Sequence, residues 1–179
     1  CSGGGVEPQA ETVGRQDDKE GVQRMAVVSK MDRLGGDFFR VVKMIEDRRG
    51  AQPVALQLPI GSEEKFAGII DLIQMKAVIW EDESLGAKFR VEAIPESMIA
   101  EARQYHDKLL ETVADCDEAI MEKYLEGKEI NESELRRGIR NAALAIKIVP
   151  VLCGSAFRNK GVQPLLDAVV DYLPSPLDI

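Results

Sequence analysis

The sequence predicts an α/β fold, because a β-α unit stands near each end and a mixed segment separates the two. Each unit pairs a short apolar run with a helical stripe: residues 25–28 with 38–45, and residues 148–153 with 162–173. Two such units require a parallel sheet. The segment between them is roughly 90 residues long, enough to form a subdomain. We therefore expect a partial parallel sheet that carries an inserted αβ subdomain.

The first helix is expected between Pro8 and Gly21. Proline favours the first helical turn, and glycine favours the residue after the last turn. One face of this helix carries the apolar residues Val6, Ala10 and Val13. A strand over residues 25–28 follows.

A polar turn leads from that strand into the second helix. Asp37 is a suitable N-cap, and apolar residues recur every three or four positions toward Arg49. Gly50 ends the helix. The polar turn, residues 29–33, therefore lies at the carboxyl end of a strand.

The middle of the chain alternates in polarity with a period of two, which predicts a small antiparallel or mixed sheet. The expected strand segments are 54–60, 69–73, 78–80 and 89–91. Three helices follow: one after Pro95, one from Asp117 to Leu125, and one that starts at the capping box of Asn131 and Glu134.

The closing β-α unit contains a proline inside its strand. Pro150 lacks an N–H, so we expect it at the start of the strand or on an edge strand. Gly154, Ser155 and Ala156 turn the chain toward the last helix. Pro174 ends that helix, and a linker begins there.

Composition excludes two classes of function. No stretch of the 179 residues approaches the ~18–20 consecutive apolar residues of a membrane span. The 23 Lys and Arg against 31 Asp and Glu give a net charge of −8, which argues against sequence-specific or broad binding of nucleic acid and favours basic protein partners. Three cysteines without paired spacing and a lone histidine predict a reduced, cytoplasmic chain without a metal site.

Two loops follow the carboxyl ends of the predicted parallel strands, where open α/β sheets bind ligands: 29–33 and 154–157. An Asp32 carboxylate there can accept hydrogen bonds from both N1–H and the exocyclic amine of guanine, whereas it repels the ring N1 of adenine. The Lys30 stem can lie along the base, and an N–H near Ala156 can donate to the guanine carbonyl. The alternative is a solvated turn in which Asp32 caps a helix.

Eight segments carry a family resemblance. They are GGVEPQ (4–9) with ETV (11–13), SKMDR (29–33), GDFFRV (36–41), QLPIG (57–61), GIIDL (68–72), MEKYLEG (121–127), VPVLCGSAF (149–157) and DYLPSP (171–176). Together they resemble elongation factor G, a translational GTPase, over nearly the whole chain. Two positions depart from that family: Ser29 replaces the usual asparagine, and Gly14 replaces a large aromatic residue.

The resemblance implies a partial P-loop GTPase-type sheet with the family's G′ subdomain inserted. Ser29, Lys30 and Asp32 then correspond to the base-recognition motif, and Ser155 and Ala156 to the second base-recognition loop. The implied parts are 1–54 (first part of the C-terminal half of the GTPase domain), 55–147 (G′ insert), 148–173 (last strand and helix) and 174–179 (linker).

The implied function is guanine recognition for GTP or GDP in GTP-driven translocation on the ribosome, in the cytoplasm and without a membrane partner. The phosphate-binding pattern G-x-x-x-x-G-K-[ST] is absent from the sequence. We therefore expect no catalytic residue and no Mg²⁺ ligand in this chain, and no hydrolysis of GTP by it alone. A chain that opens on Cys1 instead of methionine is expected to be a processed product or a fragment of a longer parent factor.

Acidic residues gather on the helices of the predicted insert. The resemblance implies that they dock the ribosomal stalk protein L7/L12, while a solvated face is the alternative. A further alternative for the whole chain is a non-catalytic binding module that docks a basic partner through these helices. The candidate partner-binding residues are Glu101, Asp107, Glu111 and Asp115.

Three other groups of residues have simpler interpretations. His106 is expected to be a packed or boundary histidine rather than a catalyst, because no partner is apparent. Cys116 and Cys153 are expected to be small buried hydrophobes. Three arginines of one helix are expected on a solvated face, with contact to ribosomal RNA as the alternative: Arg136, Arg137 and Arg140.

Overall fold

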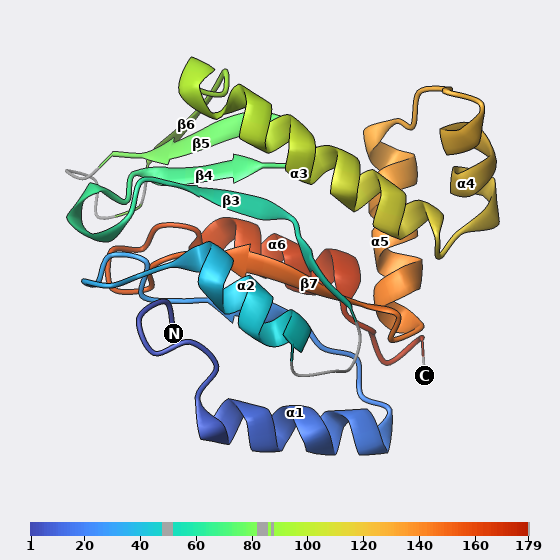
Figure 1. The fold of residues 1–179 in the computed structure, drawn as a ribbon, viewed down its shortest axis with the longest axis horizontal. Coiled ribbons are helices and arrows are strands. Elements are labelled where there is room, and N and C mark those ends of the chain that lie inside the picture. Colours follow the sequence, from blue (N-terminus) through green and yellow to red (C-terminus); the bar gives the residue numbers. More distant parts are fainter. Residues whose placement is uncertain (48–51, 82–85, 87, 179) are drawn as a thin grey trace.

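Two sheets of different kinds form the frame of the molecule (Figure 1). The computed structural model describes residues 1–47, 52–81, 86 and 88–178. A three-stranded parallel sheet has the order β1-β7-β2, with β1 at Ala26–Val28, β7 at Ile148–Cys153 and β2 at Gln52–Ala55. A four-stranded antiparallel sheet has the order β3-β4-β5-β6, with β3 at Gln57–Ile60, β4 at Gly68–Asp71, β5 at Lys76–Trp80 and β6 at Phe89–Glu92. The predicted α/β fold with a mixed insert is confirmed.

Helices cover both sheets. Figure 1 shows α2 and α6 on opposite sides of the parallel sheet and α3 running along the antiparallel one. In the part of the chain that the structure describes, no helix is both long and apolar enough to cross a lipid bilayer. The helices are α1 (Pro8–Glu20), α2 (Phe38–Asp47), the short 3-10 helix η1 (Glu63–Lys65), α3 (Glu96–Ala114), α4 (Glu118–Leu125), α5 (Glu132–Leu144) and α6 (Val162–Tyr172).

Local capping groups fix the starts of three helices, and the sequence predicts two of these caps, at Asp37 and Asn131. Asp37 Oδ1 accepts a hydrogen bond from the Arg40 N–H at 3.0 Å, and Asp117 caps α4. Asn131 and Glu134 form the expected reciprocal capping box at α5. The predicted end of α2 at residues 49–50 lies outside the described residues.

The predicted single strand over residues 54–60 is wrong, because it divides between the two sheets at Leu56. The Leu56 N–H donates to the Val151 carbonyl of the parallel sheet at 3.0 Å. The Leu56 carbonyl accepts from the Leu72 N–H beside the antiparallel sheet, also at 3.0 Å. The side chains of residues 53–59 are all buried, so the chain passes from one sheet to the other without leaving the core.

The position of Pro150 corrects a second prediction, since β7 is the central strand rather than an edge strand. Alternate residues of a parallel strand bond to opposite neighbours. The Val151 carbonyl accepts from Leu56 on the β2 side, whereas the Gly154 N–H donates to Val28 on the β1 side. Pro150 therefore faces β1, which pairs with β7 only from Val151 onward. The missing N–H leaves no ladder bond unmade.

Two of the three clustered arginines are engaged, so the solvated-face interpretation is wrong for them. Arg136 Nη1 donates to Asp171 Oδ2 at 3.0 Å and to the Tyr172 hydroxyl at 3.2 Å. Arg140 Nη1 donates to the carbonyl of Asp171 at 2.9 Å. A guanidinium at the C-terminal carbonyls of α6 satisfies groups that a helix end leaves unpaired. These arginines therefore fasten α5 to α6, while Arg137 is exposed.

His106 and Cys153 take the structural roles that the sequence predicts, whereas Cys116 is less buried than expected. His106 Nδ1 lies 2.6 Å from the Leu72 carbonyl, so its Nδ1–H tautomer joins α3 to the turn after β4. Cys153 is 1% exposed, and burial raises the pKa of its thiol. Burial also raises the pKa of Cys116, which is half-buried. Burial therefore disfavours the thiolate, the reactive form, at both cysteines.

Candidate functional site

The two predicted ligand loops meet at the carboxyl ends of β1 and β7. The Gly154 N–H donates to the Val28 carbonyl at 3.1 Å, and the Met31 N–H donates back to the Gly154 carbonyl at 3.2 Å. These bonds continue the parallel ladder past the last strand residues. The first loop (29–33) and the second loop (154–157) therefore stand side by side.

The backbone of Lys30, in the first loop, has a strained conformation. Its φ is +61°, the left-handed region, which costs a non-glycine residue about 1–2 kcal/mol. The Lys30 carbonyl accepts bonds from the Ser2 hydroxyl at 2.6 Å and from the Arg33 N–H at 3.1 Å. These two bonds fix the carbonyl, while the Lys30 side chain is exposed and available to a ligand.

Ser2 is a site residue that the sequence did not reveal. It is fully buried, and its N–H donates to the Ser29 carbonyl at 2.9 Å. The Ser2 carbonyl accepts from the Asp37 N–H at 3.2 Å, so Ser2 links the first loop to the start of α2. A Cβ on Gly36 would stand 2.9 Å from Ser2 Oγ, too close for any side chain. A glycine at position 36 indicates that another part of the chain comes close there, but the sequence does not show that this part is Ser2.

Asp32 carries an unpaired carboxylate oxygen. Its Oδ1 is buried and has no hydrogen-bond partner among the described residues. A buried polar atom without a partner costs about 1–3 kcal/mol, which a ligand donor can recover. Asp37, not Asp32, caps α2. The alternative interpretation of Asp32 as a helix cap is therefore wrong.

In the second loop, Ser155 is buried and hydrogen-bonded, whereas Ala156 is exposed and can contact a ligand. Ser155 is 1% exposed, and its Oγ accepts from the Arg158 N–H at 3.2 Å. Its backbone pairs with Lys160 in both directions, at 2.9 and 3.0 Å. Ala156 is exposed, and its N–H donates to no described residue. Ser155 therefore shapes the loop, and the Ala156 N–H is the available donor.

Ser29, which replaces the asparagine of the resembling family, is half-buried. Its carbonyl accepts from Ser2, and in the described part of the chain its hydroxyl makes no hydrogen bond to the second loop. The backbone bonds between Met31 and Gly154 already join the two loops. The shorter side chain therefore leaves the loop pair intact.

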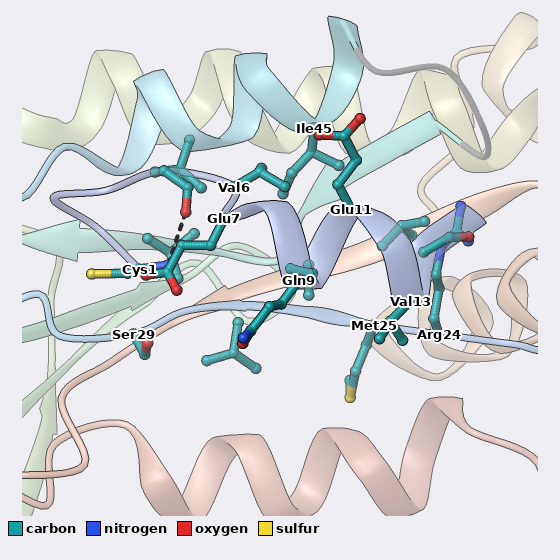
Figure 2. A pocket seen from close by; sticks show the side chains of 18 of the residues that line it. Cys1, Val6, Glu7, Gln9, Glu11, Val13, Arg24, Met25, Ser29 and Ile45 are labelled. Atoms are coloured by element: carbon teal, nitrogen blue, oxygen red, sulfur yellow. Dashed lines mark hydrogen bonds between the residues drawn. The ribbon is translucent and has the colours of Figure 1, made fainter. Parts of the chain in front are cut away.

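A cavity of about 840 Å³ lies beside the loops rather than over them (Figure 2). It runs between α1 and β1, and its lining includes the predicted apolar face of α1 at Val6 and Val13 together with Met25. Val13 is 57% exposed, so this face contacts little protein. Only Ser29 and Lys30 of the candidate site line the cavity.

Gly14, the second departure from the resembling family, also lines this cavity. A Cβ there would meet no atom within 4 Å, so the position has room for a large side chain. The Gly14 carbonyl accepts from Arg24 at 2.8 Å, which ties the middle of α1 to the segment before β1. The helix therefore forms without an aromatic residue.

The candidate partner-binding residues lie apart from these loops, on the insert. Glu101, Asp107 and Glu111 are exposed on α3, and Asp115 is exposed at its C-terminal cap. No group of three or more His, Cys, Asp or Glu side chains that could hold a metal ion occurs among the described residues.

Comparison with known proteins identifies the family. A sequence model of the elongation factor Tu GTP-binding domain matches residues 1–175. The chain belongs to this family. The description of this family names GTP binding, and the expected family of translational GTPases is confirmed.

A solved structure supports the fold of this GTP-binding domain. A protein from Thermus thermophilus superposes with a TM-score of 0.87 and 29% sequence identity over 99% of the chain. The chain spans only 26% of that protein. The parallel and antiparallel sheets are therefore part of a GTPase-type fold that the two chains share.

Proposed function

We propose that the first and second loops recognise the guanine base of GTP or GDP within a translation elongation factor of the G type. The observation that carries this proposal is the buried, unpaired Oδ1 of Asp32 on a loop that is hydrogen-bonded to the loop of Ala156. An acceptor and an N–H donor on adjoining loops match the donor-rich edge and the carbonyl of guanine.

The chemistry favours guanine over adenine. The Asp32 carboxylate accepts from guanine N1–H and the exocyclic amine, while the Ala156 N–H donates to the carbonyl. Adenine presents a ring acceptor to the carboxylate and an amine to the N–H, so both contacts become repulsive. The exposed Lys30 stem covers one face of the base.

Titration of the chain with GDP and with ADP, followed by NMR, tests this proposal. Without phosphate contacts we expect weak binding of GDP, on the order of millimolar, with shifts at Asp32 and Ala156. ADP should leave these signals unmoved. Equal shifts with the two nucleotides, or none with GDP, would refute base recognition.

Replacing Asp32 gives a sharper test of the carboxylate. An Asp32→Asn side chain still accepts from N1–H, but its NH₂ donates, which suits the second carbonyl of xanthine. The variant should lose GDP and gain xanthosine diphosphate. Asp47→Asn on α2 removes the same charge from an exposed position and should retain the preference for GDP. Unchanged preference in Asp32→Asn would contradict the role of Asp32.

We also infer that this chain alone does not hydrolyse GTP. Phosphoryl transfer depends on groups that position the phosphates, the metal and the water, and the phosphate-binding pattern is absent from its sequence. In a phosphate-release assay the chain should match the buffer control. Turnover above that control would overturn the inference.

The part in GTP-driven translocation on the ribosome, in the cytoplasm, is proposed for a longer parent factor that also holds Mg²⁺. The resemblance to elongation factor G supports this proposal, as does the small share of the Thermus protein that the chain spans. Mass spectrometry of the native gene product should find a chain several times longer. A native product of this length would contradict the proposal.

A second proposal concerns the acidic residues of α3, which would dock the ribosomal stalk protein L7/L12 or another basic partner. The observation in favour is that Glu111 and Asp115 are both exposed. The double variant Glu111→Lys with Asp115→Lys should weaken stalk binding, most strongly at low salt. Asp47→Lys with Asp167→Lys reverses two exposed charges outside the insert and serves as control. Equal affinity of the two variants would count against docking. Stalk binding without any GDP selectivity would favour the binding-module alternative.

A further inference from the structure

The turn that joins β3 to β4, residues 61–67, contacts both loops of the candidate site. On the first loop, the Glu63 N–H donates to the Met31 carbonyl at 2.9 Å. Glu63 Oε1 also accepts from the Gly35 N–H at 2.8 Å. Glu63 therefore binds the backbone on both sides of Asp32.

Lys160 joins the second loop to the same turn. Its side chain is 3% exposed, and Nζ donates to the Phe66 carbonyl at 2.9 Å. Its backbone pairs with Ser155, the residue before Ala156. A buried ammonium that donates to a carbonyl of another segment fixes the separation of the two backbones.

The backbone of the turn is itself tightly constrained. Glu63 has φ of +57°, a left-handed conformation that a non-glycine residue adopts only when its surroundings impose it. A Cβ on Gly61 would collide with the Lys65 carbonyl oxygen, so this turn closes on itself. Because these contacts constrain its backbone, the turn can serve as a fixed reference for the two loops.

We propose that Glu63 and Lys160 are positioning residues for base recognition: they tie both loops to one turn of the insert, so that Asp32 and the Ala156 N–H face the same base. This inference rests on the proposed function. Neither residue touches the base. Glu63 fixes the position of the backbone around Asp32 relative to the turn. Lys160 fixes the position of the backbone before Ala156 relative to the same turn.

The variants separate positioning from general stability. Glu63→Ala removes the side-chain acceptor, whereas Glu63→Gln retains an oxygen for the Gly35 N–H. Lys160→Met removes the ammonium at similar length. Glu64→Ala changes an exposed neighbour in the same turn and is the matched control.

The first measurement is amide hydrogen exchange at Met31, whose N–H bonds to Gly154, in the chain without nucleotide. Loss of either contact should raise this exchange by about tenfold in Glu63→Ala and in Lys160→Met. Glu63→Gln and Glu64→Ala should stay near the original chain. If Lys160→Met fails to fold, the comparison of Glu63→Ala with Glu63→Gln still tests the inference.

The second measurement is GDP affinity by NMR titration. Glu63→Ala should bind GDP several-fold more weakly, and Glu63→Gln should restore the affinity. Unchanged Met31 exchange, or faster exchange with unchanged GDP affinity, would overturn the inference. If the original chain shows no preference for GDP over ADP, the proposed function fails, and the exchange result alone then decides whether the turn holds the loops.

Discussion

Compared with the helices of the insert, the two loops of the parallel sheet leave their polar groups less completely paired. At α5, Asn131 and Glu134 satisfy each other's backbone donors. At the first loop, Asp32 Oδ1 is buried without a described partner, and Lys30 is held in a left-handed conformation. Left-handed residues also occur in the insert, at Met75 and Ile146, so the unpaired Asp32 oxygen is what distinguishes the loops. A buried group without a partner is typical of a ligand site, whereas complete pairing marks supporting structure.

The largest expected effect comes from the core of the insert. Leu58 is fully buried in β3, so Leu58→Ala should lower the free energy of unfolding by about 2–5 kcal/mol. Val91 in β6 is 51% exposed, and Val91→Ala should change the free energy of unfolding by less than about 1 kcal/mol. Urea unfolding measures both. Similar losses in the two variants would show that burial does not distinguish these strands.

Arg140→Ala should have the next largest effect. It removes donors from the carbonyls at the end of α6, at a cost of about 1–3 kcal/mol in the free energy of unfolding. Arg137→Ala, an exposed neighbour on the same helix, is the control and should be nearly neutral. Urea denaturation of the two variants makes the comparison. A neutral Arg140→Ala would contradict its role as a helix cap.

The same kind of truncation should act differently in the two regions. Asn131→Ala removes a helix cap and should cost about 1 kcal/mol. Asp32→Ala removes a buried oxygen without a described partner, so the free energy of unfolding should stay level or rise by about 1 kcal/mol. Thermal unfolding of both variants without nucleotide checks this contrast. If Asp32→Ala destabilises the chain as much as Asn131→Ala does, the contrast between the unpaired loop and the paired helix cap is wrong.

The smallest expected effect is on the stability of the fold in acid. Hydrogen bonds from Lys123 and from the Asn131 backbone lower the pKa of Glu134 below its ordinary value of 4.5. A lowered pKa in the folded chain contributes stability above pH 4.5, and this contribution is lost as the pH falls through the lower, folded value. Thermal unfolding on both sides of pH 4.5 should show a shallower acid dependence in Glu134→Gln. An identical pH profile would rule the carboxylate out as a contributor.

Features encoded over a few neighbouring residues were predictable. The capping box of Asn131 needs only four residues, and the polar loop with Asp32 follows directly from the strand before it. Ser2, Glu63 and Lys160 escaped prediction, because their side-chain bonds join residues 28, 28 and 94 positions apart. Nothing local marks such pairs.

Two errors had the same origin in tertiary contacts. The sequence shows that Pro150 lacks a donor, but not which neighbouring strand that position faces. It shows that Arg140 is charged, but not that the end of α6 lies beside it. In both cases the deciding partner comes from a distant part of the chain.

The central position of β7 has a consequence for folding. The antiparallel sheet joins strands that follow one another along the chain, so its hairpins can close early, over short loops. β1 and β2 do not pair with each other and must wait for β7, which lies beyond the whole insert. Gln52 of β2, for example, pairs with Ile148 of β7, on the far side of the insert. Such non-local pairing slows folding. During synthesis the insert can therefore fold first, and the first and second loops take shape last.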